Sequence, residues 1–223
     1  MKTLGFIHTA WMMVEVIKKE LIALPVPFNA FHIWDETLLI DFMKKGGLSP
    51  WIIRKFSQHA ITAEEAGADF IIITCSSTSP AVDVIKRFVN RPVLKIDEPM
   101  AEEAVKKGRK IGIVATVATT LEPTSDLLKQ KASELGKEIS ISTALCQESF
   151  QAILKGDTER HDRLVMEKAI ALARGVDVLA LAQGSMARLA FSLGNQVSIP
   201  VLSSPSLLMG KLRSIIEASG GKE

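Results

Sequence analysis

The residues best suited to chemistry in this chain of 223 residues stand in short polar stretches that follow apolar runs. The most informative stretch is IIITCSSTSP at positions 71–80, where Cys75 is followed by four hydroxyl residues and a proline. A cysteine at the end of a strand is most often an inert apolar filler. At a strand-to-helix turn, however, the helix N-terminus stabilises negative charge and favours a reactive thiolate. Cys75 is therefore the candidate for a residue that transfers a proton.

Three further stretches place polar residues after apolar runs, at positions 8–9, 116–120 and 183–185. Hydroxyls, backbone N–H groups and helix N-termini together can hold a small anion such as a carboxylate. Any one of these hydroxyls could simply cap a helix, but two hydroxyl-rich loops at matching places favour an anion site. The predicted substrate-binding residues are Thr9, Ser76, Ser77, Thr78, Thr116, Thr119, Thr120, Gln183, Gly184 and Ser185.

Several other classes of site have no support in the sequence. There is no GxxxxGK[ST] loop and no GxGxxG after the first strand-like run, so we expect no nucleotide cofactor. The four histidines form no HxxxH or HExxH pair and the two cysteines form no CxxC, so we expect no metal. A net charge of +2 without a basic run argues against nucleic acid. With two cysteines and no apolar run of about 18 residues, a cytoplasmic protein outside the membrane is expected.

Strand-like and helix-like runs alternate along the first half of the chain. This alternation is typical of an α/β fold with parallel strands and helices on both faces. The inner strands are apolar throughout, as expected for strands that are buried on both faces. The expected strands are 2–9, 28–35, 68–76 and 91–97, and the expected helices are 10–24, 50–67, 79–89 and 98–108.

The same pattern then starts again at a nearly constant offset. Gly5 and Gly112 are 107 positions apart, and Cys75 and Gln183 are 108 apart. We therefore expect two α/β lobes related by a pseudo-twofold axis, 1–105 and 106–223, each a short parallel sheet flanked by helices. The last helix is the candidate to pack back on the first lobe. Ligands of open parallel sheets bind beyond the carboxyl ends of the strands, so the active site is expected in a cleft between the lobes.

These stretches resemble the aspartate/glutamate racemase superfamily, which includes hydantoin and glutamate racemases, maleate isomerase and arylmalonate decarboxylase. The resemblance covers nearly the whole chain and rests on DFIIITCSST, GRKIGIVATVATTLEPT and GVDVLALAQGSMARL. It implies a cofactor-independent isomerase with one thiol on each face of a small carboxylic acid substrate. One thiol takes the α-proton and the other returns a proton, and Cys75 matches the first of them. A dimer is common in the superfamily.

The sequence departs from this pattern at the second thiol. The family motif GC(A/T)GM corresponds here to residues 182–186, AQGSM, so that Gln183 replaces the cysteine. An amide has no useful proton to give at neutral pH, but it can donate hydrogen bonds to a carboxylate or an enolate. The remaining cysteine, Cys146, is expected to be a structural filler.

Three hypotheses follow from this departure. A racemase or isomerase, which the resemblance favours, needs another acid/base, and His8 is the candidate second catalytic residue. A lyase that decarboxylates a malonate-type acid needs only one proton donor, Cys75, together with donors for the enediolate. The third hypothesis is a protein that binds a carboxylate without turning it over.

Overall fold

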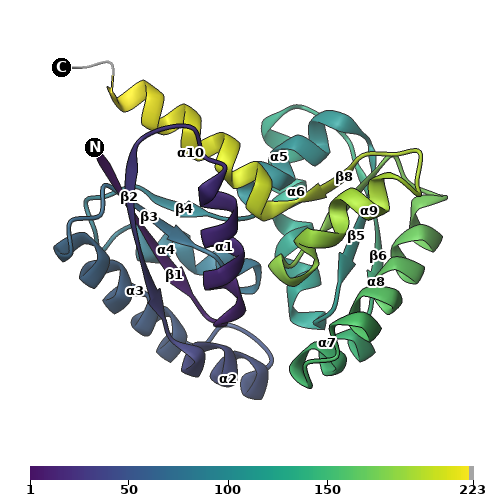
Figure 1. The fold of residues 1–223 in the computed structure, drawn as a ribbon, viewed down its shortest axis with the longest axis horizontal. Coiled ribbons are helices and arrows are strands. Elements are labelled where there is room, and N and C mark those ends of the chain that lie inside the picture. Colours follow the sequence, from purple (N-terminus) through teal and green to yellow (C-terminus); the bar gives the residue numbers. More distant parts are fainter. Residues whose placement is uncertain (221–223) are drawn as a thin grey trace. The chain divides into compact units, whose positions relative to one another are not determined.

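Two separate four-stranded parallel sheets form the framework of the computed structural model, which describes residues 1–220. The strand orders are β2-β1-β3-β4 and β6-β5-β7-β8, so the second sheet repeats the topology of the first. Helices flank both sheets (Figure 1). The prediction of an α/β fold with two similar lobes is confirmed.

Unit 1 contains the first sheet. Its strands are β1 (Lys2–His8), β2 (Phe28–Trp34), β3 (Phe70–Ile73) and β4 (Val93–Lys95). Its helices are α1 (Met12–Ile22), α2 (Glu36–Lys45), α3 (Pro50–Glu65), the 3-10 helix η1 (Ser76–Ala81) and α4 (Val82–Ile85). One face of the sheet packs against α2, α3 and α4, and the other packs against α1 and the C-terminal helix α10 (Ser204–Gly220).

Unit 2 contains the second sheet. Its strands are β5 (Lys110–Ala115), β6 (Ser140–Leu145), β7 (Val178–Leu181) and β8 (Val201–Ser203). Its longer helices are α5 (Glu98–Lys107), α6 (Leu121–Glu134), α7 (Gln147–Leu154) and α8 (Thr158–Ala173). The short ones are η2 (Ala118–Thr120), η3 (Gly184–Leu189) and α9 (Ala190–Gly194). One face packs on α5 and α6, and the other on α8, η3 and α9.

The two units divide the chain differently from the predicted boundary after residue 105. Unit 1 consists of Met1–Ile96 and the part of α10 from Leu208 onward, and unit 2 is Asp97–Leu207. Helix α5 belongs to unit 2 because Met100, Ala104 and Val105 are buried against the apolar side chains of β5 and β7. Apolar side chains of α10, including Leu212, are buried in the core of unit 1 instead.

The repeated glycines of the first strand in each unit have a packing reason. A Cβ at Gly5 would lie 3.0 Å from the ring of Phe31 and 3.1 Å from Ala68. A Cβ at Gly112 would lie 2.8 Å from Leu179. A side chain at either position would therefore require the neighbouring groups to shift, which favours glycine there.

Among residues 1–220, every helix is too short or too polar to cross a lipid bilayer.

Candidate active site

Cys75 stands where β3 ends and η1 begins, and it is partly exposed. The turn that carries it is held by Thr78, whose backbone N–H and hydroxyl both donate to the Cys75 carbonyl, at 3.1 and 3.0 Å. Thr78 is buried, and its hydroxyl is engaged in this contact. The structure therefore gives Thr78 a role in shaping the turn, whereas the sequence predicts a contact with substrate.

The other predicted binding residues of unit 1 lie at the same carboxyl edge of the sheet. Thr9 follows β1 and is buried. Ser76 and Ser77 form the start of η1, where Ser76 is buried and Ser77 is partly exposed. Their contact with a ligand stays a prediction.

His8, the predicted second acid/base, is the last residue of β1 and is fully buried. Its Nδ1 lies 2.8 Å from Thr74 Oγ1, and its Nε2 lies 2.8 Å from His32 Nδ1. Burial, and then the neighbouring His32, lower the pKa of His8 to about 3, so the ring is neutral near pH 7. Both ring nitrogens are thus engaged inside the protein. Catalysis by His8 stays a prediction, and these contacts favour a supporting role.

Gln183 and Thr116 lie together at the carboxyl edge of unit 2, following β7 and β5. The backbone N–H of Thr116 donates to Gln183 Oε1, and the Thr116 hydroxyl donates to the same oxygen at 2.9 Å. A backbone N–H can only donate, so the oxygen of the amide must face Thr116. The amide nitrogen of Gln183 consequently points away, with two N–H donors for another partner.

The remaining predicted residues of unit 2 surround this pair. Thr116 and Thr120 are buried, and Thr119 is partly buried. The hydroxyl of Thr119 is buried without a hydrogen-bond partner among the described residues. Gly184 and Ser185 are partly exposed at the start of η3. The structure thus brings Thr116 and Gln183 into direct contact, as sequence spacing alone could not show.

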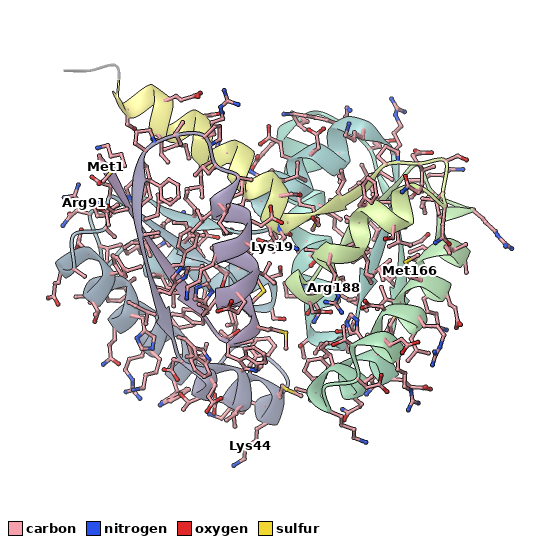
Figure 2. All side chains as sticks on the ribbon, in the orientation of Figure 1. Met1, Lys19, Lys44, Arg91, Met166 and Arg188 are labelled. Atoms are coloured by element: carbon pink, nitrogen blue, oxygen red, sulfur yellow. The ribbon has the colours of Figure 1, made fainter. Side chains whose placement is uncertain are left out.

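Sequence reasoning missed Arg188, which extends from η3 (labelled in Figure 2). Its guanidinium donates to the Ser185 carbonyl and to both carboxylate oxygens of Asp162 near the start of α8, with Nε 3.1 Å from Oδ2. These contacts fasten the loop after Gln183 to a helix of the same unit. No local motif joins the two residues, since they lie 26 positions apart.

Cys146 lies in a very different environment from Cys75. It is 4% exposed at the end of β6, and burial raises the pKa of its thiol to about 11. Cys146 also borders a hollow of about 460 Å³ between residues of α7 and α8. A buried, protonated thiol of this kind is a poor nucleophile, which agrees with a structural role.

Within residues 1–220, no group of three or more histidine, cysteine, aspartate or glutamate side chains is placed to hold a metal ion.

A sequence model of the family described as Asp/Glu/Hydantoin racemase matches residues 42–212. A glutamate racemase of Picosynechococcus sp. is 28% identical over 140 residues, which are 60% of this chain and 49% of that protein. A glutamate racemase of Aquifex pyrophilus is 34% identical over 91 residues, 40% of this chain and 35% of that protein. The matches thus cover about half, or less, of the length of these curated relatives.

Solved structures extend the likeness to the whole fold. The allantoin racemase from Klebsiella pneumoniae superposes with a TM-score of 0.73 at 19% identity, covering 98% of this chain and 89% of that one. A glutamate racemase from Francisella tularensis, in complex with D-glutamate, gives a TM-score of 0.75 at 17% identity, covering 98% and 82%. At such identities the likeness concerns the fold alone.

Proposed function

Because this chain belongs to the Asp/Glu/hydantoin racemase family, we propose that it is a cofactor-independent isomerase acting on a small carboxylic or amino acid. The proposed reaction moves a proton at the α-carbon of the substrate, and Cys75 is the residue that carries this proton. Its thiol stands at the carboxyl end of β3 and is partly exposed. In open parallel sheets this is the edge at which ligands bind.

The observation that carries the second half of the proposal is the orientation of Gln183. When the α-carbon loses a proton or CO₂, negative charge remains on it and spreads onto the oxygens of the neighbouring carboxylate. Fixed N–H donors stabilise such charge, because they need no reorganisation as it develops. Thr116 holds the Gln183 oxygen and so aims its N–H groups elsewhere. We assign these N–H groups to the substrate carboxylate or its enediolate.

The other polar residues have two kinds of proposed role. Thr78 and Thr116 act indirectly, since their hydroxyls hold Cys75 and Gln183. Direct contacts with the carboxylate are proposed for the remaining predicted residues: Thr9, Ser76, Ser77, Thr119, Thr120, Gly184 and Ser185.

The presence of Gln183 at the second-thiol position favours a second candidate function, a decarboxylase of malonate-type acids. In that reaction the bond between the α-carbon and one carboxylate breaks, CO₂ leaves, and its electron pair remains as an enediolate. The Cys75 S–H then gives its proton to the α-carbon, and the thiolate regains a proton from water. One thiol is sufficient for this sequence of steps, and an amide that only donates hydrogen bonds serves it well.

Solvent-deuterium exchange followed by NMR tests the proposal over a panel of amino acids, hydroxy acids, hydantoins and substituted malonates. Exchange at an α-carbon supports the isomerase, and release of CO₂ with deuterium in the product supports the decarboxylase. Cys75→Ala is the control for both, and Cys146→Ala is its match at the other thiol. If no acid exchanges or decarboxylates, yet one of them protects Cys75 from alkylation, the protein binds carboxylates without turnover.

A further inference from the structure

Three polar side chains form a continuous hydrogen-bonded chain across the carboxyl ends of β3, β1 and β2 in unit 1. Thr74 Oγ1 lies 3.1 Å from the Ile7 carbonyl and 2.8 Å from His8 Nδ1. The opposite nitrogen of His8, Nε2, lies 2.8 Å from His32 Nδ1. Thr74 directly precedes Cys75 in the sequence, so this chain ends one residue before the thiol.

The contacts assign a direction to each hydrogen bond. The Thr74 hydroxyl has one proton, which it donates to the Ile7 carbonyl. It therefore accepts from His8 Nδ1–H, and His8 Nε2 must accept from His32 Nδ1–H. The two rings also stack, with centroids 5.1 Å apart and planes 23° apart. Every member is thus held by its neighbour in one defined arrangement.

Such a chain is costly to place inside a protein. His8 is completely buried and Thr74 is 5% exposed. Buried polar groups destabilise the folded state unless every one of them finds a partner. A fold that needed only packing at these positions would place small apolar residues there.

Unit 2 has alanine at two of the three equivalent positions and an exposed threonine at the third, and its repeated topology makes it an internal control. The register of the two sheets pairs Thr74, His8 and His32 of unit 1 with Ala182, Ala115 and Thr143 of unit 2. The backbone contact is the same in both units, since Thr74 N–H donates to the Ile7 carbonyl at 3.1 Å and Ala182 N–H donates to the Val114 carbonyl at 3.0 Å. The sheet therefore forms without the polar chain. Unit 2 lacks both the polar chain and a thiol after its third strand, where Gln183 stands instead.

We propose that His32 and His8 are positioning residues for the Cys75 thiol and act on it through Thr74. The hydrogen bonds hold Thr74, which follows β3, against β1. They thereby fix the direction in which Cys75, the next residue, projects its side chain. This inference rests on Cys75 being the reactive group of the proposed function. It adds His32 and Thr74, to which the sequence pattern assigns no role, to the residues on which that group depends.

The test uses two pairs of variants that differ only in hydrogen bonding. Thr74→Val keeps the shape of the side chain but removes the hydroxyl, whereas Thr74→Ser keeps it. His32→Leu removes the donor to His8, whereas His32→Asn retains an N–H close to the place of Nδ1. Thr143→Leu makes the matched change in unit 2. The measurement is the rate at which iodoacetamide alkylates Cys75, followed by mass spectrometry of its peptide.

We expect Thr74→Val and His32→Leu to slow alkylation of Cys75 by about five- to tenfold, the rate factor that corresponds to one buried hydrogen bond. Thr74→Ser, His32→Asn and Thr143→Leu should react at the wild-type rate. A loss of rate without rescue by serine or asparagine would overturn the proposal, since general destabilisation would then explain it. The proposal would also be overturned if Cys75 were alkylated at the wild-type rate in folded Thr74→Val and His32→Leu variants.

A measurement on the wild-type protein covers the case in which these variants do not fold. Alkylation of Cys75 should shift the ring nitrogen resonances of His8 and His32 in NMR spectra, because the chain of contacts joins them to Thr74. Unchanged resonances would overturn the proposal. An inert Cys75 in the folded wild type would instead remove the thiol from the proposed function, and this role with it.

Discussion

Unit 1 and unit 2 are built on the same strand order and the same register, but their carboxyl edges carry opposite chemistry. Unit 1 follows β3 with a partly exposed thiol, Cys75, and the residue before it, Thr74, lies in hydrogen-bond contact with His8, which in turn contacts His32. Unit 2 ends β7 with an amide, Gln183, whose oxygen is held by Thr116. A thiol can exchange a proton, whereas an amide can only donate and accept hydrogen bonds. The comparison teaches that one half of this fold is suited to move a proton and the other to stabilise charge.

The residues near the thiol and near the amide also differ between the two units. The thiol side uses a buried histidine where the amide side uses Ala115, although both positions end the first strand of their sheet. On the amide side, a single threonine sets the orientation, with a backbone N–H and a hydroxyl on one oxygen. The polar residues at the two carboxyl edges thus differ, while the cores beneath both sheets are apolar.

The largest expected effect is at the thiol. Cys75→Ala should lower the rate of α-proton exchange or decarboxylation by about 10²–10⁴-fold, the usual contribution of an acid/base group. The assay is the NMR exchange experiment, with Cys146→Ala as the matched control in unit 2. In the wild type, iodoacetamide should also label Cys75 well before Cys146, whose pKa is raised to about 11. Faster labelling of Cys146 would reverse the assignment of roles to the two units.

The next effect is at the amide. Gln183→Ala should lower the turnover rate by about 10²-fold, because it removes fixed donors to the charge that develops on the substrate. The measurement is kcat and KM for whichever acid the panel identifies, and the loss should appear mainly in kcat. A loss confined to KM would mean that Gln183 only binds the ground state.

Gln183→Cys removes this difference between the units, because it places a second thiol after β7, as the resemblance to the family implies. If Gln183 faces the substrate, this variant should gain measurable racemisation of a chiral product acid from either enantiomer. Chiral chromatography of the acid after incubation with wild type and with the variant follows the reaction. No gain in racemisation would argue that this position does not face the α-carbon.

A smaller effect is expected at Thr116. Thr116→Val removes one of the two donors to the Gln183 oxygen but leaves the backbone N–H in place. Turnover should fall by about fivefold, which corresponds to one hydrogen bond. Thr116→Ser keeps the hydroxyl and serves as the control. Equal rates in the valine and serine variants would show that the backbone contact is sufficient.

The smallest effect concerns stability and pH. Burial lowers the pKa of His8 from 6.5 to about 3. Between these pH values, the unfolded chain therefore binds a proton at His8 that the folded protein does not bind. The free energy of unfolding should therefore decrease as the pH falls from about 6.5 towards 3. Burial lowers the pKa of His161 in unit 2 as well, which adds to the same slope.

His8→Ala introduces the residue that unit 2 has at the equivalent position. It should reduce the slope of stability against pH, although it also lowers stability at every pH by leaving a cavity. Urea unfolding at several pH values gives both quantities. An unchanged slope would mean that the pKa of His8 is the same in the folded and the unfolded protein.

Much of the fold could be predicted from the sequence, since its signals are local. Apolar runs ending in hydroxyl residues marked the strand ends, and the offset between Gly5 and Gly112 revealed the repeat. The thiol after β3 and the glutamine after β7 could be located for the same reason. The boundary between the units could not be predicted in this way. No local pattern indicates which of the two cores the apolar face of α5 joins.

The sequence by itself therefore determined the fold class, the repeat and the residues at the strand ends. Tertiary structure alone decided what those residues touch. The β1–β2 register places His32 beside the rings of Phe6 and His8, and a slip of one residue would turn it to the other face of the sheet. The β5–β7 pairing likewise brings Thr116 to Gln183, 67 positions away. Periodicity reports which face of an element is apolar, but contacts between distant strands depend on register and packing, which no local pattern records.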